Sequence, residues 1–107
     1  MMKSLEVVKM LAALAQPTRL ALFRLLVTCG PEGMAAGQVA EKLQVSPATL
    51  SFHFKTLSHA GLIERKQDGR FIYYTANFTV MNGMVDYLTE NCCSGNAAAC
   101  NVPSKKC

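Results

Sequence analysis

The sequence predicts a mainly helical domain that carries one small β-hairpin. Four segments with helical spacing of apolar residues come first, two short runs rich in Ile, Phe and Tyr follow, and a last amphipathic segment completes the order ααααββα. A chain of 107 residues has room for one domain and not for two. Half of its residues are hydrophobic, which allows a modest core, and the composition excludes a disordered, collagen-like or coiled-coil protein.

A proline separates the first two helices. Ser4 is expected to cap a first helix that runs to about Ala15. Gln16-Pro17 ends it, because proline disfavours helical backbone at the preceding residue but suits the first turn of the next helix. The second helix, from Thr18 to about Thr28, is apolar on nearly every side, so we expect it at the centre of the fold.

The next two helices are predicted to form a helix-turn-helix. The first covers residues 36–43, and a tight turn leads to Ser46, a suitable N-cap that is followed by proline at the first helical position. The second begins at Pro47 and runs to about Ala60, where Gly61 ends it. Its apolar stripe, which we expect to face the core, consists of Leu50, Phe54 and Leu57.

A hairpin and a last helix complete the domain. Two strand-like runs, residues 62–66 and 70–75, are joined by Gln67-Asp68-Gly69, whose Asp-Gly pair is typical of a tight turn. Asn77 is expected to cap the last helix, and from Asn91 onward no apolar stripe continues. The predicted organisation is therefore a winged helix-turn-helix domain, residues 1–91, and a flexible cysteine-rich tail, residues 92–107.

One face of the fourth helix suits DNA. Small or hydrogen-bonding side chains point away from its apolar stripe near its N-terminus, as a helix that enters a major groove requires. An arginine lies at the tip of the hairpin, where it can reach a minor groove. The net charge of +4 favours a polyanionic partner only mildly. The predicted DNA-contacting residues are Ser46, Ala48, Thr49, Ser51, Phe52, Lys55, Thr56 and Arg70.

Some of these side chains also have a structural explanation. Phe52 either packs on a thymine methyl group or a sugar edge, or covers a neighbouring loop. Arg65, Lys66 and Arg70 equally suit an ordinary solvated hairpin. We expect His53, beside the apolar stripe, to be a hydrogen-bonded core histidine.

Cysteine is distributed unevenly along the chain. Four of the five cysteines lie in the last 16 residues, whereas Cys29 ends an apolar helix and is expected to be a small buried hydrophobe. The sequence has no apolar run long enough to span a membrane and no signal-peptide core, so we expect a cytoplasmic protein without a membrane partner. In a reducing cytosol, clustered thiols indicate metal or metalloid binding, or redox sensing.

Five short motifs follow one another: QPTRL at residues 16–20, VAEKL at 39–43, SPATLSFHFKTL at 46–57, AGLI at 60–63 and DGRFIYY at 68–74. In this order they resemble the ArsR/SmtB family of metal- and metalloid-responsive repressors, and the resemblance covers about residues 7–90. It implies a winged-helix homodimer, joined through its first and last helices, that binds operator DNA and leaves it when an inducer binds.

The available ligands indicate which inducer such a protein would sense. The family's arsenic site beside the recognition helix is absent because residues 37–43 hold no cysteine, and its zinc site is absent because the last helix has Asp86 but no histidine. The tail resembles the arsenite-responsive subgroup with carboxy-terminal cysteines, and soft thiolates select thiophilic centres. We expect no permanently bound cofactor, and As(III) or Sb(III) as the inducer. The expected ligands are Cys92, Cys93 and Cys100, with Cys107 as an alternative third.

Other interpretations of the thiols remain open. Four thiolates also suit a tetrahedral Zn²⁺ or Cd²⁺ site, with ligands from one or both subunits. A reversible disulfide at Cys92 or Cys93 would make a redox or persulfide sensor. A thiol metallochaperone or an arsenate-reducing enzyme is a different class. The sequence has no phosphate-cradling loop and no acid–base pair, so we expect neither an enzyme nor an organic substrate.

The adjacency of two cysteines also predicts the conformation at the end of the last helix. Cys92 and Cys93 cannot point the same way on a regular helix. The end of the last helix is therefore expected to fray or turn.

Overall fold

Helices make up most of the protein. The structure, a computed structural model, describes residues 2–95. The helices in this range are α1 (Ser4–Leu14), α2 (Pro17–Cys29), α3 (Ala36–Leu43), α4 (Pro47–His59) and α5 (Phe78–Thr89). The strands are β1 (Met34–Ala35), β2 (Ile63–Asp68) and β3 (Phe71–Ala76). Short 3₁₀ helices cover Gly30–Glu32 and Cys92–Gly95.

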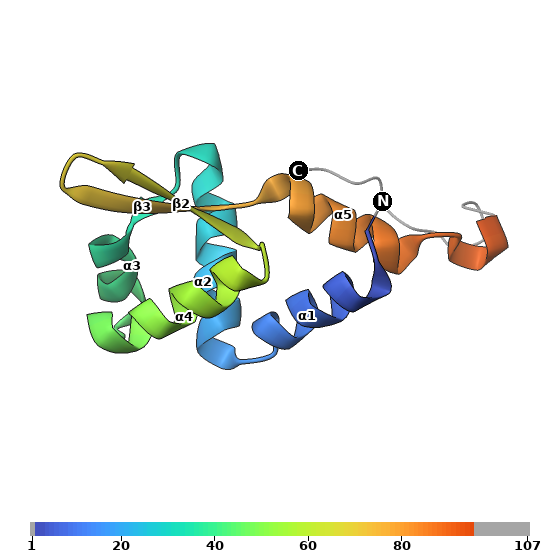
Figure 1. Cartoon of the computed structure of the whole chain (residues 1–107), viewed down its shortest axis with the longest axis horizontal. Coiled ribbons are helices and arrows are strands. Elements are labelled where there is room, and N and C mark those ends of the chain that lie inside the picture. Colours follow the sequence, from blue (N-terminus) through green and yellow to red (C-terminus); the bar gives the residue numbers. More distant parts are fainter. Residues whose placement is uncertain (1, 96–107) are drawn as a thin grey trace.

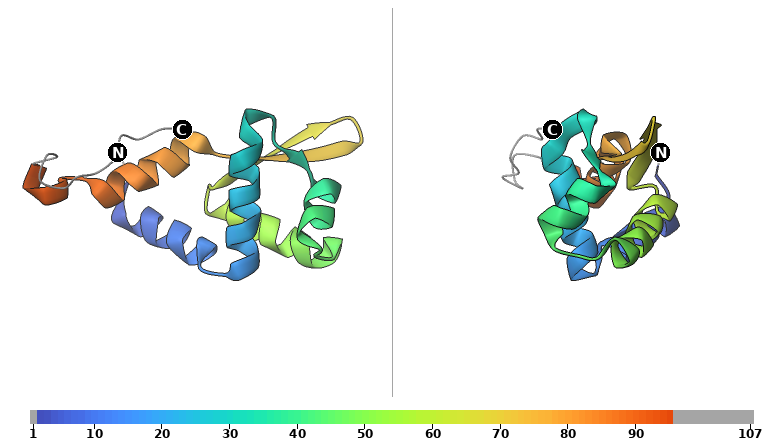
Figure 2. Two further views of the ribbon diagram at one scale, coloured as in Figure 1. Left: turned by 180° about the vertical axis from the view of Figure 1, so that it is seen from behind. Right: turned by 90° about the vertical axis from the view of Figure 1, so that its left-hand side faces the viewer.

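The hairpin and the last helix lie at opposite ends of the molecule. The β2–β3 hairpin and α3 lie at one end, α1 and α5 lie together at the other, and α2 crosses between them (Figures 1 and 2). α4 lies along the lower side in Figure 1 and packs on α1, α2, α3 and β2. The predicted mainly helical winged helix-turn-helix is confirmed.

The helix starts follow from capping side chains. Gln16 accepts a hydrogen bond from the backbone N–H of Arg19 at 2.7 Å, and Asn77 caps α5 in the same way, at 3.1 Å from the N–H of Val80. The predicted cap at Ser4 is wrong. Lys3 occupies the cap position, and its backbone N–H donates to the Glu6 carboxylate at 2.9 Å.

The core forms where α2 meets the helix-turn-helix. Leu22 and Leu26 of α2 are fully buried, which confirms the expected central position of this helix. The predicted stripe of α4, Leu50, Phe54 and Leu57, is buried as well. Gly61 ends α4 with φ 79°, a left-handed conformation that favours glycine and that turns the chain into β2.

The sequence analysis missed one strand of the sheet. β1 pairs antiparallel with β3, with Met34 opposite Tyr74 and Ala35 opposite Tyr73, so the sheet has the order β1-β3-β2. A strand of two residues carries no alternation, and this one forms only because β3 supplies a partner. Gly33, with φ 72°, makes the approach possible, since a Cβ atom there would collide with the backbone oxygen of Tyr74.

The hairpin is tighter than predicted. Asp68 was expected in the turn, but β2 continues through it and pairs it with Phe71. The turn consists of Gly69 and Arg70, with Gly69 at φ 62°. Arg70 is therefore at the tip of the wing, as expected.

The end helices leave apolar surface uncovered. Met84 is the buried residue of α5, whereas Val85 and Leu88 are 37% and 56% exposed. In α1, Leu5 and Val8 are 80% and 57% exposed.

No single helix among residues 2–95 is long and apolar enough to cross a membrane. Helices Ser4–Leu14 and Pro17–Glu32 reach that length and hydropathy only as a pair, and they are bent by 103°.

Candidate nucleic-acid interface and thiol site

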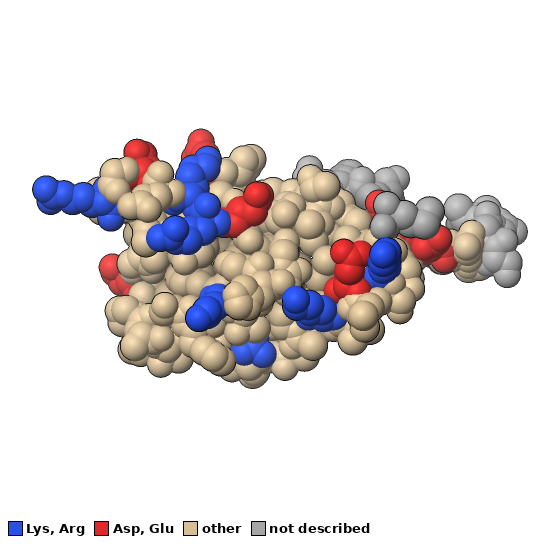
Figure 3. All heavy atoms as spheres, in the orientation of Figure 1, with Lys and Arg blue, Asp and Glu red and all other residues tan. Residues whose placement is uncertain are grey.

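The predicted recognition face of α4 is exposed. Of the eight predicted DNA-contacting residues, only Thr56 is half-buried, and its hydroxyl donates to the backbone carbonyl of Phe52 at 3.2 Å. Seven of the eight lie in or beside α4, and Arg70 stands apart at the wing tip. The space-filling view shows Lys and Arg side chains over the hairpin, with acidic side chains among them, and further basic side chains along the lower side (Figure 3). Their contacts with DNA stay a prediction.

The Ser46 hydroxyl forms two hydrogen bonds at the start of α4. The Ser46 hydroxyl accepts from the backbone N–H of Thr49 at 3.3 Å and donates to the Thr49 hydroxyl at 3.0 Å. These bonds fix both side chains while leaving them exposed. The first turn of α4 is thus held in a defined geometry.

The wing and the recognition helix are joined by aromatic stacking. The rings of Phe54 in α4 and Tyr74 in β3 are parallel to within 6°, with centroids 3.8 Å apart. This contact packs the base of the hairpin against α4. The tyrosine was not singled out from the sequence, because the stacking joins residues twenty positions apart.

Phe52 points outward. Its side chain is 63% exposed, and its ring contacts the edge of the His53 ring at a centroid distance of 5.9 Å. This exposure favours the outward interpretation of Phe52 over the one in which it covers a neighbouring loop. An exposed phenyl group on this face suits apolar contact with a base.

His53 is a core histidine, as predicted. It is 7% exposed, and its Nδ1 lies 3.5 Å from Nη1 of Arg19. A guanidinium only donates, so Nδ1 must accept and the proton of the neutral ring lies on Nε2. Burial and, secondly, the positive charge of Arg19 lower the pKa of His53 from its ordinary value. The ring is neutral at pH 7.

Arg19 connects three helices, which the sequence analysis did not foresee. Besides its contact with His53 in α4, its Nε donates to the backbone carbonyl of Ala13 near the end of α1 at 2.6 Å. Its own backbone starts α2. The available signal was an arginine two residues after Pro17 at a helix start, where its side chain can reach back to the preceding helix end.

We expect the unfolding free energy to fall as the pH is lowered through and below 6.5. The unfolded chain binds a proton at His53 near this value, whereas the folded chain resists it until lower pH, so stability is complete above 6.5 and declines below. Urea denaturation between pH 7.5 and 5.5 measures the slope. His53→Gln should have a shallower slope than the native protein, and equal slopes would contradict the prediction.

Cys92 and Cys93 lie shortly after the last helix. α5 ends at Thr89, and Asn91 and Cys93 adopt positive φ values of 56° and 54°. This turn brings Sγ of Cys92 to 3.8 Å from Sγ of Cys93, which confirms that the helix ends before the pair. Cys92 is half-buried and Cys93 exposed.

Of the three remaining cysteines, one lies within the described residues. Cys100 and Cys107 lie outside the described residues, so the third ligand and the tail boundary stay predictions. Cys29, expected to be buried, is only half-buried at the end of α2.

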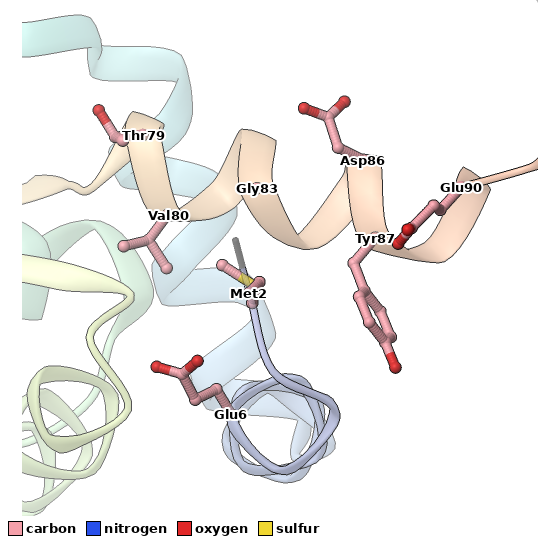
Figure 4. Close-up of a pocket in the computed structure, with 8 residues that line it drawn as sticks. All are labelled: Met2, Glu6, Thr79, Val80, Gly83, Asp86, Tyr87 and Glu90. Atoms are coloured by element: carbon pink, nitrogen blue, oxygen red, sulfur yellow. The ribbon is translucent and has the colours of Figure 1, made fainter.

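A groove between α1 and α5 carries three carboxylates. It has a volume of about 490 Å³ and includes Glu6, Asp86 and Glu90 in its lining, with Asp86 pointing away from Glu6 (Figure 4). Within residues 2–95, no three His, Cys, Asp or Glu side chains are grouped closely enough to hold a metal ion. Gly83 lies opposite Met2, and a Cβ atom there would approach the methionine methyl group to 2.8 Å.

Comparisons with known proteins agree with this geometry. Residues 14–66 match the family described as "Helix-turn-helix domain". The transcriptional repressor SdpR of Bacillus subtilis is 34% identical over 76 residues, which are 71% of this chain and 81% of that protein. The arsenical resistance operon repressor of Staphylococcus aureus is 30% identical over 103 residues, or 95% of this chain and 96% of that protein. The regulator YceK of B. subtilis is 43% identical over 61 residues, so the match spans 57% of this chain but only 60% of YceK.

Solved structures show the same architecture. An ArsR-like transcriptional regulator from Rhodococcus sp. RHA1 superposes with a TM-score of 0.72 at 26% identity, covering 88% of this chain and 86% of that one. A homodimeric winged helix-turn-helix DNA-binding domain from Mycobacterium bovis superposes with a TM-score of 0.64 at 22% identity, over 86% and 85% of the chains. From these sequence and structural matches together, the chain belongs to the ArsR/SmtB family of winged helix-turn-helix transcriptional repressors.

Proposed function

We propose that the protein is a homodimeric repressor that trivalent arsenic or antimony releases from its operator by binding to thiolates of the tail. The observation that carries this proposal is the position of Cys92 and Cys93 directly after α5, with their sulfur atoms 3.8 Å apart. Family membership alone does not select the inducer, since an arsenical repressor and SdpR are both relatives.

Dimerisation is supported by the apolar surface at one end of the molecule. α1 and α5 lie side by side there and line a common groove (Figures 1 and 4). Both helices also carry exposed leucine and valine side chains, and exposed apolar surface often marks a protein interface. The M. bovis relative is homodimeric. The side chains that we propose to meet their symmetry mates are Leu5, Val8, Leu11, Val85 and Leu88.

Dimerisation makes DNA binding bivalent. Two recognition helices related by a two-fold axis would enter successive major grooves about one DNA turn apart. The exposed face of α4 and Arg70 at the wing tip provide the contacts. The stacked rings of Phe54 and Tyr74 pack the wing on α4 and so help to orient the two parts of this surface.

The spacing of the sulfur pair suits a thiophilic centre. Two thiolates on a tetrahedral ion with bonds of about 2.3 Å stand about 3.8 Å apart, and a pyramidal centre with similar bonds brings them slightly closer. The Cys92 and Cys93 sulfurs already have this separation. Arsenous acid would exchange its three hydroxyl groups for three thiolates, and each exchange releases one water molecule from the thiol proton and the hydroxyl group.

Arsenic binding would act on DNA through α5. The pair is three residues from the last helical residue, Thr89, so that closing the thiol site pulls on the helix that joins the subunits. A tilt of this helix misaligns the two α4 helices. Coupling of about 1–3 kcal/mol, typical of such switches, weakens operator binding about 5- to 150-fold.

A redox sensor is the second candidate, and the same contact favours it. The sulfur atoms of Cys92 and Cys93 lie 3.8 Å apart, and reversible conversion between thiol and disulfide at these residues would be the signal. A soft metal ion such as Cd²⁺ or Zn²⁺ is the third. The three candidates share the fold and the thiols, and they differ only in the chemical signal.

Fluorescence anisotropy of a labelled duplex from the protein's own upstream region tests the proposal. With excess reductant, arsenite should weaken binding at least 5-fold, and Cd²⁺, Zn²⁺ or a mild oxidant without arsenite should not. Release by oxidant alone would select the redox sensor, and release by Cd²⁺ alone a metal sensor. By reciprocity, operator DNA should weaken arsenite binding by the same factor. Equal arsenite affinity for free and DNA-bound protein would contradict the proposal.

A further inference from the structure

We propose that a basic hollow between α1 and α4 is a second DNA-backbone site, which binds a phosphate group outside the recognition helix and the wing. It rests on the proposed function, since it extends the DNA-binding surface. The hollow has a volume of about 300 Å³, and its polar lining consists of Lys9, Arg19, Thr56 and His59. None of these residues except Thr56 belongs to the predicted DNA interface.

The hollow has the chemistry of an anion site. Lys9 comes from α1, Arg19 from the start of α2, and His59 from the last residue of α4, so three helices bring basic groups together. Alanine side chains form the rest of the wall, and none of the described residues that line it is acidic. A phosphate group would therefore meet positive charge and hydrogen-bond donors without a carboxylate to repel it.

Arg19 supplies a fixed charge at the base of this hollow. Its Nε is held by the Ala13 carbonyl at 2.6 Å, and Nη1 by His53 at 3.5 Å. A guanidinium has five N–H donors, so others remain beyond these two contacts. A half-buried cation that is held in place by its neighbours loses little entropy when a phosphate arrives. Lys9 and His59 are exposed and line the same hollow.

The position of the hollow relative to α4 selects DNA as the source of the phosphate. Thr56 and His59 follow Lys55 along α4, and Lys9 belongs to α1, which lies with α5 at the end of the molecule away from the hairpin (Figure 1). If the subunits meet through α1 and α5, as proposed, DNA that crosses the α4 face would pass this side on its way to the dimer axis. The hollow would then hold the backbone between the two half-sites.

Salt-dependent binding of Lys9→Gln tests the site. The native protein and the variant are titrated with a duplex from the upstream region and with a scrambled duplex of equal length, between 0.05 and 0.3 M salt. A lost phosphate contact lowers the slope of log affinity against log salt by about 0.9. We expect about 3- to 10-fold weaker binding of both duplexes at 0.15 M salt, because backbone contacts are independent of sequence.

Matched variants separate this site from a general charge effect. Lys9→Arg should bind as the native protein does, whereas Lys9→Glu and His59→Gln should bind more weakly. Arg24→Gln removes an equal charge at an exposed position of α2 outside the hollow and should change affinity less than 2-fold. If Arg24→Gln and Lys9→Gln lose affinity and slope equally, the hollow is not a site.

Two results would contradict the proposed phosphate site and leave the proposed function unaffected. In the first, the native protein binds its upstream duplex and Lys9→Gln binds it equally well with an unchanged salt slope. In the second, inorganic phosphate raises the melting temperature of the native protein but not that of Lys9→Gln, while the two proteins bind DNA equally well. This result would assign the hollow to free phosphate. Failure of the native protein to bind the duplex would instead contradict the proposed function.

Discussion

Leu88→Glu is expected to convert the protein from a dimer into a monomer. Leu88 is 56% exposed on α5, and α1 also carries exposed apolar residues. Burial of one leucine contributes about 1.5–3 kcal/mol, and two-fold symmetry doubles every interface change. A carboxylate buried in its place, without a partner, weakens association further. Sedimentation equilibrium at 10 µM protein should show a dissociation constant raised at least 1,000-fold.

DNA binding should follow the loss of the dimer. A monomer engages one half-site, and the loss of the second, linked contact weakens operator binding about 100-fold or more. Leu20→Glu is the matched control, because Leu20 is 44% exposed on α2 and lies outside the proposed interface. It should remain dimeric and bind DNA as before. A dimer that persists in Leu88→Glu and in Leu5→Glu would place the interface elsewhere.

Local signals in the sequence predicted most of the helices. α3 has the predicted bounds, and α4 differs by one residue at its C-terminus, because Ser46, Pro47 and Gly61 each have a steric or hydrogen-bonding role that depends only on their neighbours. The burial of Leu50 and Leu57 follows from helical periodicity alone. These features need no knowledge of the tertiary structure.

The features that were missed depend on distant parts of the chain. β1 exists only through its pairing with Tyr73 and Tyr74, about forty residues away. Arg19 reaches His53 across 34 positions, and no local pattern indicates that contact. The cap of α1 is Lys3 and not Ser4, because the Glu6 carboxylate accepts a hydrogen bond from the backbone N–H of Lys3. Helix starts at two adjacent positions differ little in energy.

The candidate site was predictable in composition but not in geometry. The exposure of Phe52 favours one of the two interpretations that the sequence had left open. For the thiols, the sequence required that the helix end before the pair. The sulfur separation of 3.8 Å depends on the positive φ values of Asn91 and Cys93, and neither residue type makes such a value certain.

Cys92→Ser and Cys93→Ser should each abolish the response to arsenite while leaving operator affinity unchanged. Either change removes one of three arsenic–sulfur bonds, and the serine hydroxyl is a poor ligand for a thiophilic centre. We expect the arsenite concentration for half-maximal release to rise at least 100-fold. Cys29→Ser is the matched control, because this half-buried thiol ends α2 and is not part of the proposed site.

The same variants distinguish the third ligand and the type of signal. If Cys100 completes the site, Cys100→Ser loses the response and Cys107→Ser keeps it; the reverse result assigns Cys107. Under reducing conditions the native protein and Cys29→Ser must both release DNA on arsenite addition. A Cys93→Ser protein that still releases DNA with native arsenite sensitivity would remove the pair from the sensor, because a centre that does not need Cys93 gains nothing from the 3.8 Å contact at the end of α5.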